Sequence, residues 1–67
     1  MAGSETRTII ELVGGGEIAT PEEPVEVAQR LTGDVGFVRV EDVDGRQHWV
    51  NPAQVTEFYE PATPAGS

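Results

Sequence analysis

The feature that most constrains this chain is the dipeptide Asp44-Gly45, which separates two short segments rich in β-branched and aromatic residues, 37–43 and 48–50. An Asp-Gly pair in this setting predicts a two-residue hairpin loop of type I′, because that turn needs positive φ at both central residues. A loop of this length also sets the register of the two strands. The predicted pairs are Val43 with Arg46, Glu41 with His48, Val40 with Trp49 and Val38 with Asn51.

This register gives the hairpin one core face and one outer face, because side chains in a strand alternate between faces. The core face is expected to hold Val38, Val40 and Trp49. The outer face is expected to hold the cross-strand pair Glu41 and His48. A slip of one residue would expose Trp49, so the position of the only tryptophan favours this register.

A corner is expected at residues 51–54, since Pro52 cannot donate to a ladder and holds the residue before it in an extended conformation. The alternation of side chains resumes over 55–60. We therefore predict a third strand here, and an antiparallel meander of three strands joined by two short connections.

The N-terminal part of the chain begins with a predicted strand over 6–13, which carries apolar residues on both faces. Ile9 and Val13 lie on the face opposite Ile10. Such a strand is either central in a sheet or in contact with a partner chain on one face. The glycines at 14–16 predict a turn, since the next residue is glutamate and no phosphate-binding motif follows. A very short returning strand is possible over 17–19.

A helix is predicted after the segment 20–23, which has the form of a capping box with threonine first and glutamate last. Pro24 conflicts with a start at Thr20, because it would fall where a helical N–H is needed. The helix is therefore expected to begin at Pro24. Its apolar stripe holds Val27, Ala28 and Leu31 and is expected to pack on the core face of the hairpin.

These elements predict a small α+β fold in which one short helix packs on an antiparallel sheet, in the order β-(β)-α-β-β-β. A single domain is expected over 6–60, with a disordered N-terminus at 1–5 and a disordered C-terminal tail at 61–67. A partly open SH3-like β-barrel is the alternative, since a turn before a short last strand occurs there also.

The chain has 67 residues and no cysteine, so disulfides and thiolate metal sites are excluded. Chains of this size are marginally stable alone, and self-association into a homodimer is the remaining supplement. The net charge of −8, from twelve acidic residues and four arginines, argues against direct binding to nucleic acid or to an anionic membrane. No membrane span and no signal peptide are visible, so a cytoplasmic location is expected.

No catalytic or metal site is predicted. His48 is the only histidine, and no activated nucleophile accompanies it. The acidic residues Glu41, Asp42 and Asp44 resemble a calcium-binding loop, but the twelfth position counted from Asp42 is Ala53 rather than glutamate. We therefore expect a protein that is not an enzyme and that needs no cofactor.

The segment 45–58 bears a short resemblance to the flagellar FlbD family of small proteins. Four positions carry it, namely Gly45, Val50, Asn51 and Val55. The similar segment lies near the start of those proteins and towards the end of this chain. No function is carried across from it.

The function predicted from these observations is a non-catalytic protein–protein interaction module that self-associates, with Ile9 and Val13 as candidate contacts. The alternative is an acidic regulator, or nucleic-acid mimic, that occupies a basic surface of a DNA-binding protein or enzyme. That alternative expects one continuous acidic patch, and His48 is a further candidate interaction residue. The carboxylates of the patch are those of Glu22, Glu23, Glu26, Glu41, Asp42 and Asp44.

Overall fold

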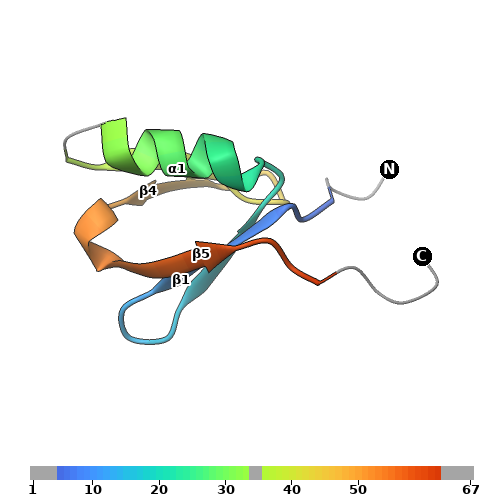
Figure 1. Ribbon diagram of the computed structural model, residues 1–67, viewed down its shortest axis with the longest axis horizontal. Coiled ribbons are helices and arrows are strands. Elements are labelled where there is room, and N and C mark those ends of the chain that lie inside the picture. Colours follow the sequence, from blue (N-terminus) through green and yellow to red (C-terminus); the bar gives the residue numbers. More distant parts are fainter. Residues whose placement is uncertain (1–4, 34–35, 63–67) are drawn as a thin grey trace.

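The computed structural model describes residues 5–33 and 36–62, and Figure 1 shows the helix α1 (Pro24–Gly33) lying over the strands. The elements in chain order are β1 (Thr8–Leu12), β2 (Glu17–Thr20), α1 (Pro24–Gly33), β3 (Val38–Glu41), β4 (Gln47–Val50), the 3-10 turn η1 (Pro52–Gln54) and β5 (Val55–Tyr59). The chain is a small α+β domain, as predicted. The tails expected at 1–5 and 61–67 fall largely outside the described residues.

The strands form two antiparallel sheets, one with the order β2-β1-β5 and one with the order β3-β4. β1 is therefore the central strand of its sheet. This was one of the two explanations predicted for its apolar residues on both faces, the other being contact with a partner chain. The predicted meander is wrong, because β5 pairs with β1 and not with β4. The reason lies in η1: the side chain of Asn51 accepts from the N–H of Ala53, and the N–H of Val13 binds the carbonyl of Gln54 at 2.8 Å. The turn thus directs the chain onto the other sheet.

The helix begins at Pro24, as predicted, and two buried threonines hold the segment before it. Thr8 and Thr20 face each other across β1 and β2. The hydroxyl of Thr8 donates to the carbonyl of Glu22 at 2.6 Å, and the hydroxyl of Thr20 accepts from its N–H at 3.3 Å. Both backbone groups of Glu22 are therefore bound before the helix starts. Within residues 5–33 and 36–62, no helix is long and apolar enough to cross a membrane.

The hairpin of β3 and β4 has a register that differs by one residue from the prediction. Val38 pairs with Val50, Arg39 with Trp49, Val40 with His48 and Glu41 with Gln47. Positive φ occurs at Gly45 but not at Asp44, so the turn is not of type I′. Instead the N–H of Gly45 binds the carbonyl of Asp42 at 3.0 Å, as in a longer loop that closes with a glycine bulge.

Two contacts favour the longer loop. The carboxylate of Asp42 accepts from the N–H groups of both Asp44 and Arg46, at 2.8 and 2.9 Å. The N–H of Val43 binds the carbonyl of Ala19 at 2.9 Å, which attaches the loop to β2. A type I′ loop would lose these bonds, so the expected Asp-Gly turn gives way to a turn built on Asp42.

The shifted register changes which side chains form the core. Trp49, expected in the core, is 62% exposed, whereas Val50 is 6% exposed and buried. The helix packs through Val27, with Leu31 partly buried beside it, as its apolar stripe predicts. The buried apolar residues form one cluster, namely Ile10, Ile18, Val27, Val38, Val40 and Val50.

Candidate interaction surfaces

Two exposed aromatic side chains border a groove between the sheets. Phe37 is 67% exposed and Trp49 is 62% exposed. They border a hollow of about 470 Å³ whose lining residues come from both sheets and from η1. The lining residues are Leu12, Ile18, Phe37, His48, Trp49, Val50, Asn51 and Gln54. We call this hollow the aromatic groove.

The aromatic groove combines apolar side chains with a few polar groups, which is typical of sites that bind peptides or small molecules. Val13, predicted as a contact, adjoins it: it is 61% exposed, and its N–H binds Gln54. The groove was not predicted from the sequence, because Trp49 was expected in the core. Asp42, two residues before the Asp-Gly dipeptide, is the signal that would have favoured the longer loop and an exposed Trp49.

The tip of the β3–β4 hairpin is organised by Asp42 and not by Glu41. The Nε2 atom of His48 lies 2.8 Å from the second carboxylate oxygen of Asp42. The expected pair between Glu41 and His48 is therefore wrong, and Glu41 faces Gln47 instead. The hydrogen bond with His48, followed by the one from the N–H of Arg46, lowers the pKa of Asp42 below 3.8. These bonds stabilise the turn.

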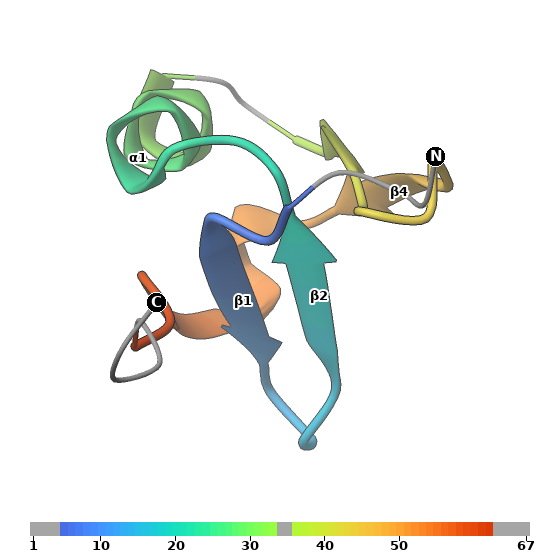
Figure 2. The same ribbon diagram turned by 90° about the vertical axis from the view of Figure 1, so that its right-hand side faces the viewer.

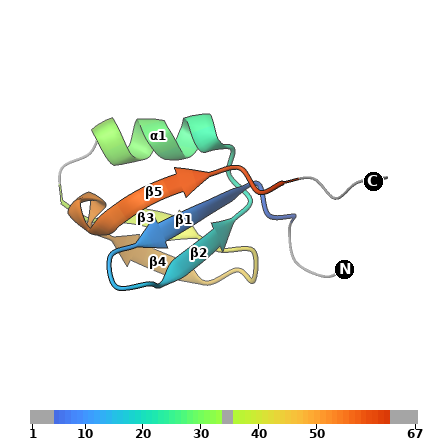
Figure 3. The ribbon, with the colours of Figure 1, turned by 60° about the horizontal axis from the view of Figure 1, so that its bottom comes forward.

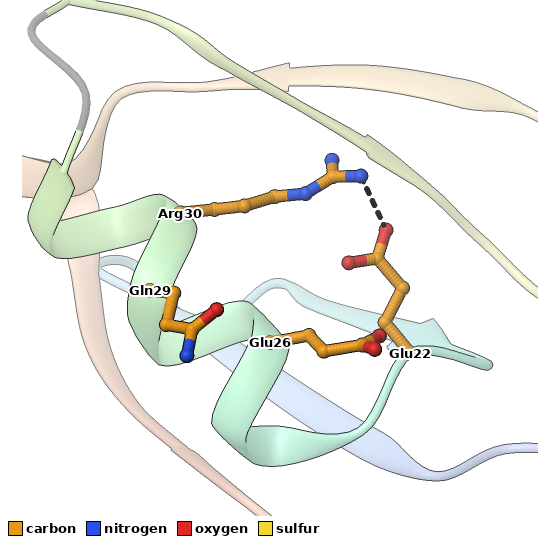
Figure 4. A pocket seen from close by; sticks show the side chains of 4 residues that line it. All are labelled: Glu22, Glu26, Gln29 and Arg30. Atoms are coloured by element: carbon orange, nitrogen blue, oxygen red, sulfur yellow. Dashed lines mark ion pairs between the residues drawn. The ribbon is translucent and has the colours of Figure 1, made fainter.

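A second group of carboxylates lies around the start of α1, where the helix dipole favours negative charge. Glu22 forms an ion pair with Arg30, in which Oε2 of Glu22 lies 3.3 Å from Nη2 of Arg30 (Figure 4). Glu23 pairs with Arg7 at 3.2 Å. Glu26 lies beside them and lines an open hollow of about 570 Å³ together with Glu22, Gln29 and Arg30. Arg30 also donates to the carbonyl of Arg39, which joins the helix to β3.

The six carboxylates expected to form one patch lie in two groups. Three surround the start of the helix, and three lie at the end of β3 and in the turn that follows. Figure 2 shows α1 and the tip of the hairpin on opposite sides of β2. His48 belongs to the second group through its contact with Asp42.

A third group of carboxylates, not singled out in the sequence, crosses the sheet β2-β1-β5. Glu11 on β1 lies directly opposite Glu17 on β2 and directly opposite Glu57 on β5. Ile9 lies on the same face, between Ala19 and Tyr59. The hydroxyl of Tyr59 donates to the carboxylate of Glu11 at 3.1 Å. That hydrogen bond, then burial, then the charges of the three glutamates raise the pKa of Tyr59 above 10.0.

The carboxylates do not converge on a point. In the part of the chain that the structure describes, no three Asp, Glu or His side chains are placed to hold a metal ion together.

Comparisons with known proteins identify no relative. No family model, no curated protein and no solved structure matches the chain. The candidate surfaces therefore rest on the sequence and the geometry alone.

Proposed function

We propose that this protein is a cytoplasmic, non-catalytic protein–protein interaction module that binds its partner through the aromatic groove. One observation carries the proposal: Phe37 and Trp49 are both more than 60% exposed beside the same hollow. Exposed aromatic side chains that gather around a hollow mark interaction sites more often than scattered exposed residues do. Aromatic residues are also enriched among the residues that dominate binding energy at interfaces.

The free energy gained by burying the two aromatic side chains indicates how large the interface must be. An aromatic side chain buries about 150–250 Å² in an interface, so covering the exposed parts of Phe37 and Trp49 contributes roughly 6 kcal/mol at about 25 cal/mol per Å². Association costs about 4–15 kcal/mol in lost freedom of motion. The two rings alone do not hold a stable complex, and the interface must extend to neighbouring exposed residues such as Val13.

A second copy of this chain is the first partner that we propose. The chain has 67 residues and no disulfide, and small domains of this kind commonly gain stability by self-association. A two-fold dimer brings the same surface of each copy together, so each groove would cover the aromatic side chains of the other.

The test is the oligomeric state of matched variants, measured by sedimentation equilibrium over a wide range of concentrations. The wild type is expected to dimerise. Trp49→Ala and Phe37→Ala are each expected to weaken the dimer by about tenfold or more, as the loss of a central aromatic contact costs about 2 kcal/mol. Val25→Ala is the control, because Val25 is 62% exposed but lies on α1.

Two outcomes would count against the proposal. One is a wild type that stays monomeric at high concentration and retains no protein from native lysate. The other is a dimer that Val25→Ala weakens as much as Trp49→Ala does.

The acidic regulator is the second function considered, and the geometry favours it less for the carboxylates first assigned to it. Glu22 and Glu23 already have arginine partners within the chain. Asp42 has three hydrogen-bond partners within the β3–β4 hairpin, namely the N–H groups of Asp44 and Arg46 and the ring of His48. Carboxylates with internal partners have less to offer a basic surface, because their charge is already partly compensated.

A further inference from the structure

The outer face of the sheet β2-β1-β5 is not covered by any other described element. Figure 3 shows the three strands in front, the β3–β4 hairpin behind them and α1 to one side. The inner face of the sheet carries Ile10 and Ile18, which belong to the buried cluster that Val27 of the helix completes. The only α-helix of the described residues therefore covers the inner side, and no helix or strand within 5–33 and 36–62 lies over the outer side.

The outer face carries two parallel rows of side chains. Residues directly opposite in an antiparallel pair point to the same face, and so do residues two apart in a strand. The first row is largely apolar and consists of Ala19, Ile9 and Tyr59. The second row is acidic and consists of Glu17, Glu11 and Glu57. Each row crosses all three strands.

The acidic row is unfavourable for the isolated fold. Neighbouring strands lie about 4.8 Å apart, and like charges directly opposite each other destabilise a sheet. The ion pairs of the described residues use Arg7, Arg30 and His48, and none of them reaches this row. Glu11 accepts a hydrogen bond from the neutral hydroxyl of Tyr59, and within the described residues no positive charge is paired with any of the three glutamates.

We infer that this outer face is a second docking surface, and that its occupant is a basic amphipathic helix of a protein partner. Arginine or lysine side chains of that helix lie over the row of glutamates, and its apolar side chains cover Ile9 and Tyr59. The charge complementarity selects a basic segment. The apolar row selects a protein helix over a simple cation, since a helix packed on a sheet buries apolar surface on both. This inference goes beyond the aromatic groove, which lies elsewhere and uses other residues.

The probe for the test is a helical peptide of arginine, leucine and alanine with arginine along one edge of its apolar face. Binding is followed by ¹H–¹⁵N NMR of the whole chain. The expected shifts are in the backbone amides of β1, β2 and β5. A peptide in which every arginine is replaced by glutamate is expected not to bind.

Two variants that remove the same charge at different places separate a specific surface from a general attraction. The triple variant Glu11→Gln, Glu17→Gln, Glu57→Gln is expected to bind the arginine peptide about tenfold more weakly, because it loses three charge contacts of about 0.5 kcal/mol each. The matched variant Glu22→Gln, Glu23→Gln, Glu26→Gln removes three charges near α1 and is expected to bind like the wild type. Glu57→Arg serves as the single-site check if the triple variant does not fold.

The inference fails if both triple variants weaken binding equally, since the attraction then follows net charge alone. It also fails if the peptide does not bind, or if the shifts fall on the β3–β4 hairpin. Trp49→Ala is expected to bind the peptide as the wild type does. The peptide-binding test therefore does not depend on the aromatic groove, and the dimerisation test does not depend on the glutamate row.

Discussion

Two acidic regions of this protein differ in how their charge is balanced. Around the start of α1, Glu22 and Glu23 each have an arginine within 3.3 Å. Across the sheet β2-β1-β5, the glutamates stand opposite one another, and the ion pairs of the described residues leave them without a cation. The first region is arranged for stability, because charges of opposite sign lie near a favourable helix dipole. The second region holds like charges directly opposite one another, an arrangement that is unfavourable in a sheet.

A net charge of −8 therefore does not indicate which carboxylates are paired and which are not. With four arginines for twelve acidic residues, not every carboxylate can have an arginine of its own, and the fold decides which ones do. Like charges held together against their repulsion are a stronger indication of function than acidic composition. Natural proteins often retain destabilising features at sites of function.

The largest effect on the free energy of unfolding is expected from removing the two arginines that pair with Glu22 and Glu23. The carboxylates around the start of α1 would then lack their arginine partners, as those of the sheet do. The double variant Arg7→Ala, Arg30→Ala is expected to lower the free energy of unfolding by about 1 kcal/mol, since both pairs are partly exposed and weakened by solvent. Urea unfolding followed by circular dichroism measures it. Arg46→Ala is the control, as the side chain of Arg46 forms no ion pair within the described residues. An equal loss per arginine in that control would mean that net charge, and not the pairs, sets the stability.

A smaller effect of opposite sign is expected from relieving the repulsion in the sheet. Glu17→Gln with Glu57→Gln is expected to raise the free energy of unfolding by about 0.5 kcal/mol, because it removes two cross-strand repulsions. Glu22→Gln with Glu23→Gln removes the same charge from the helix region and is expected to give no gain. Thermal and urea unfolding of the two double variants provide the comparison. An equal gain in the free energy of unfolding for both double variants would mean that the two regions do not differ in how their charges affect stability.

The smallest effect is expected in the titration of Tyr59, the only tyrosine of the chain. Its pKa is raised above 10.0 in the folded protein, first of all by the hydrogen bond to Glu11. The protonated form is therefore favoured on folding, and its contribution to stability is present below pH 10.0 and is lost as the pH rises through the folded pKa. Absorbance of the tyrosinate should show a midpoint above 10.0 that falls in Glu11→Gln. Glu23→Gln should leave the midpoint where it is in the wild type, and a fall there as well would remove the assignment to Glu11.

The elements that short-range rules govern were predicted well. The helix starts at Pro24 because proline is excluded from the next turn, a restriction that involves only neighbouring residues. The strands and the helix follow one another along the chain in the predicted order, because each is defined by a local pattern of residues. The central position of β1 agrees with apolar residues on both of its faces.

The errors lie where distant residues choose between local options of similar energy. The Asp-Gly dipeptide suits a type I′ turn and also the longer loop that is observed. The hydrogen bond from the N–H of Val43 to the carbonyl of Ala19 favours the longer loop. Because Ala19 lies outside the hairpin, the hairpin sequence alone does not predict this bond. One residue of shift then exchanges the faces of Trp49 and Val50, because side chains in a strand alternate. The aromatic groove follows from that shift, and so it was missed.

The types and order of the elements, the acidic composition and the lack of thiolate chemistry follow from the amino-acid sequence, since propensity and charge are properties of single residues and their neighbours. The tertiary structure alone decides that β5 lies beside β1, that Trp49 faces solvent and that Glu11 stands between two other glutamates. Each of these depends on which of several strands come together. That choice is made by packing and hydrogen bonds between segments far apart in the chain, where small differences in free energy select one pairing.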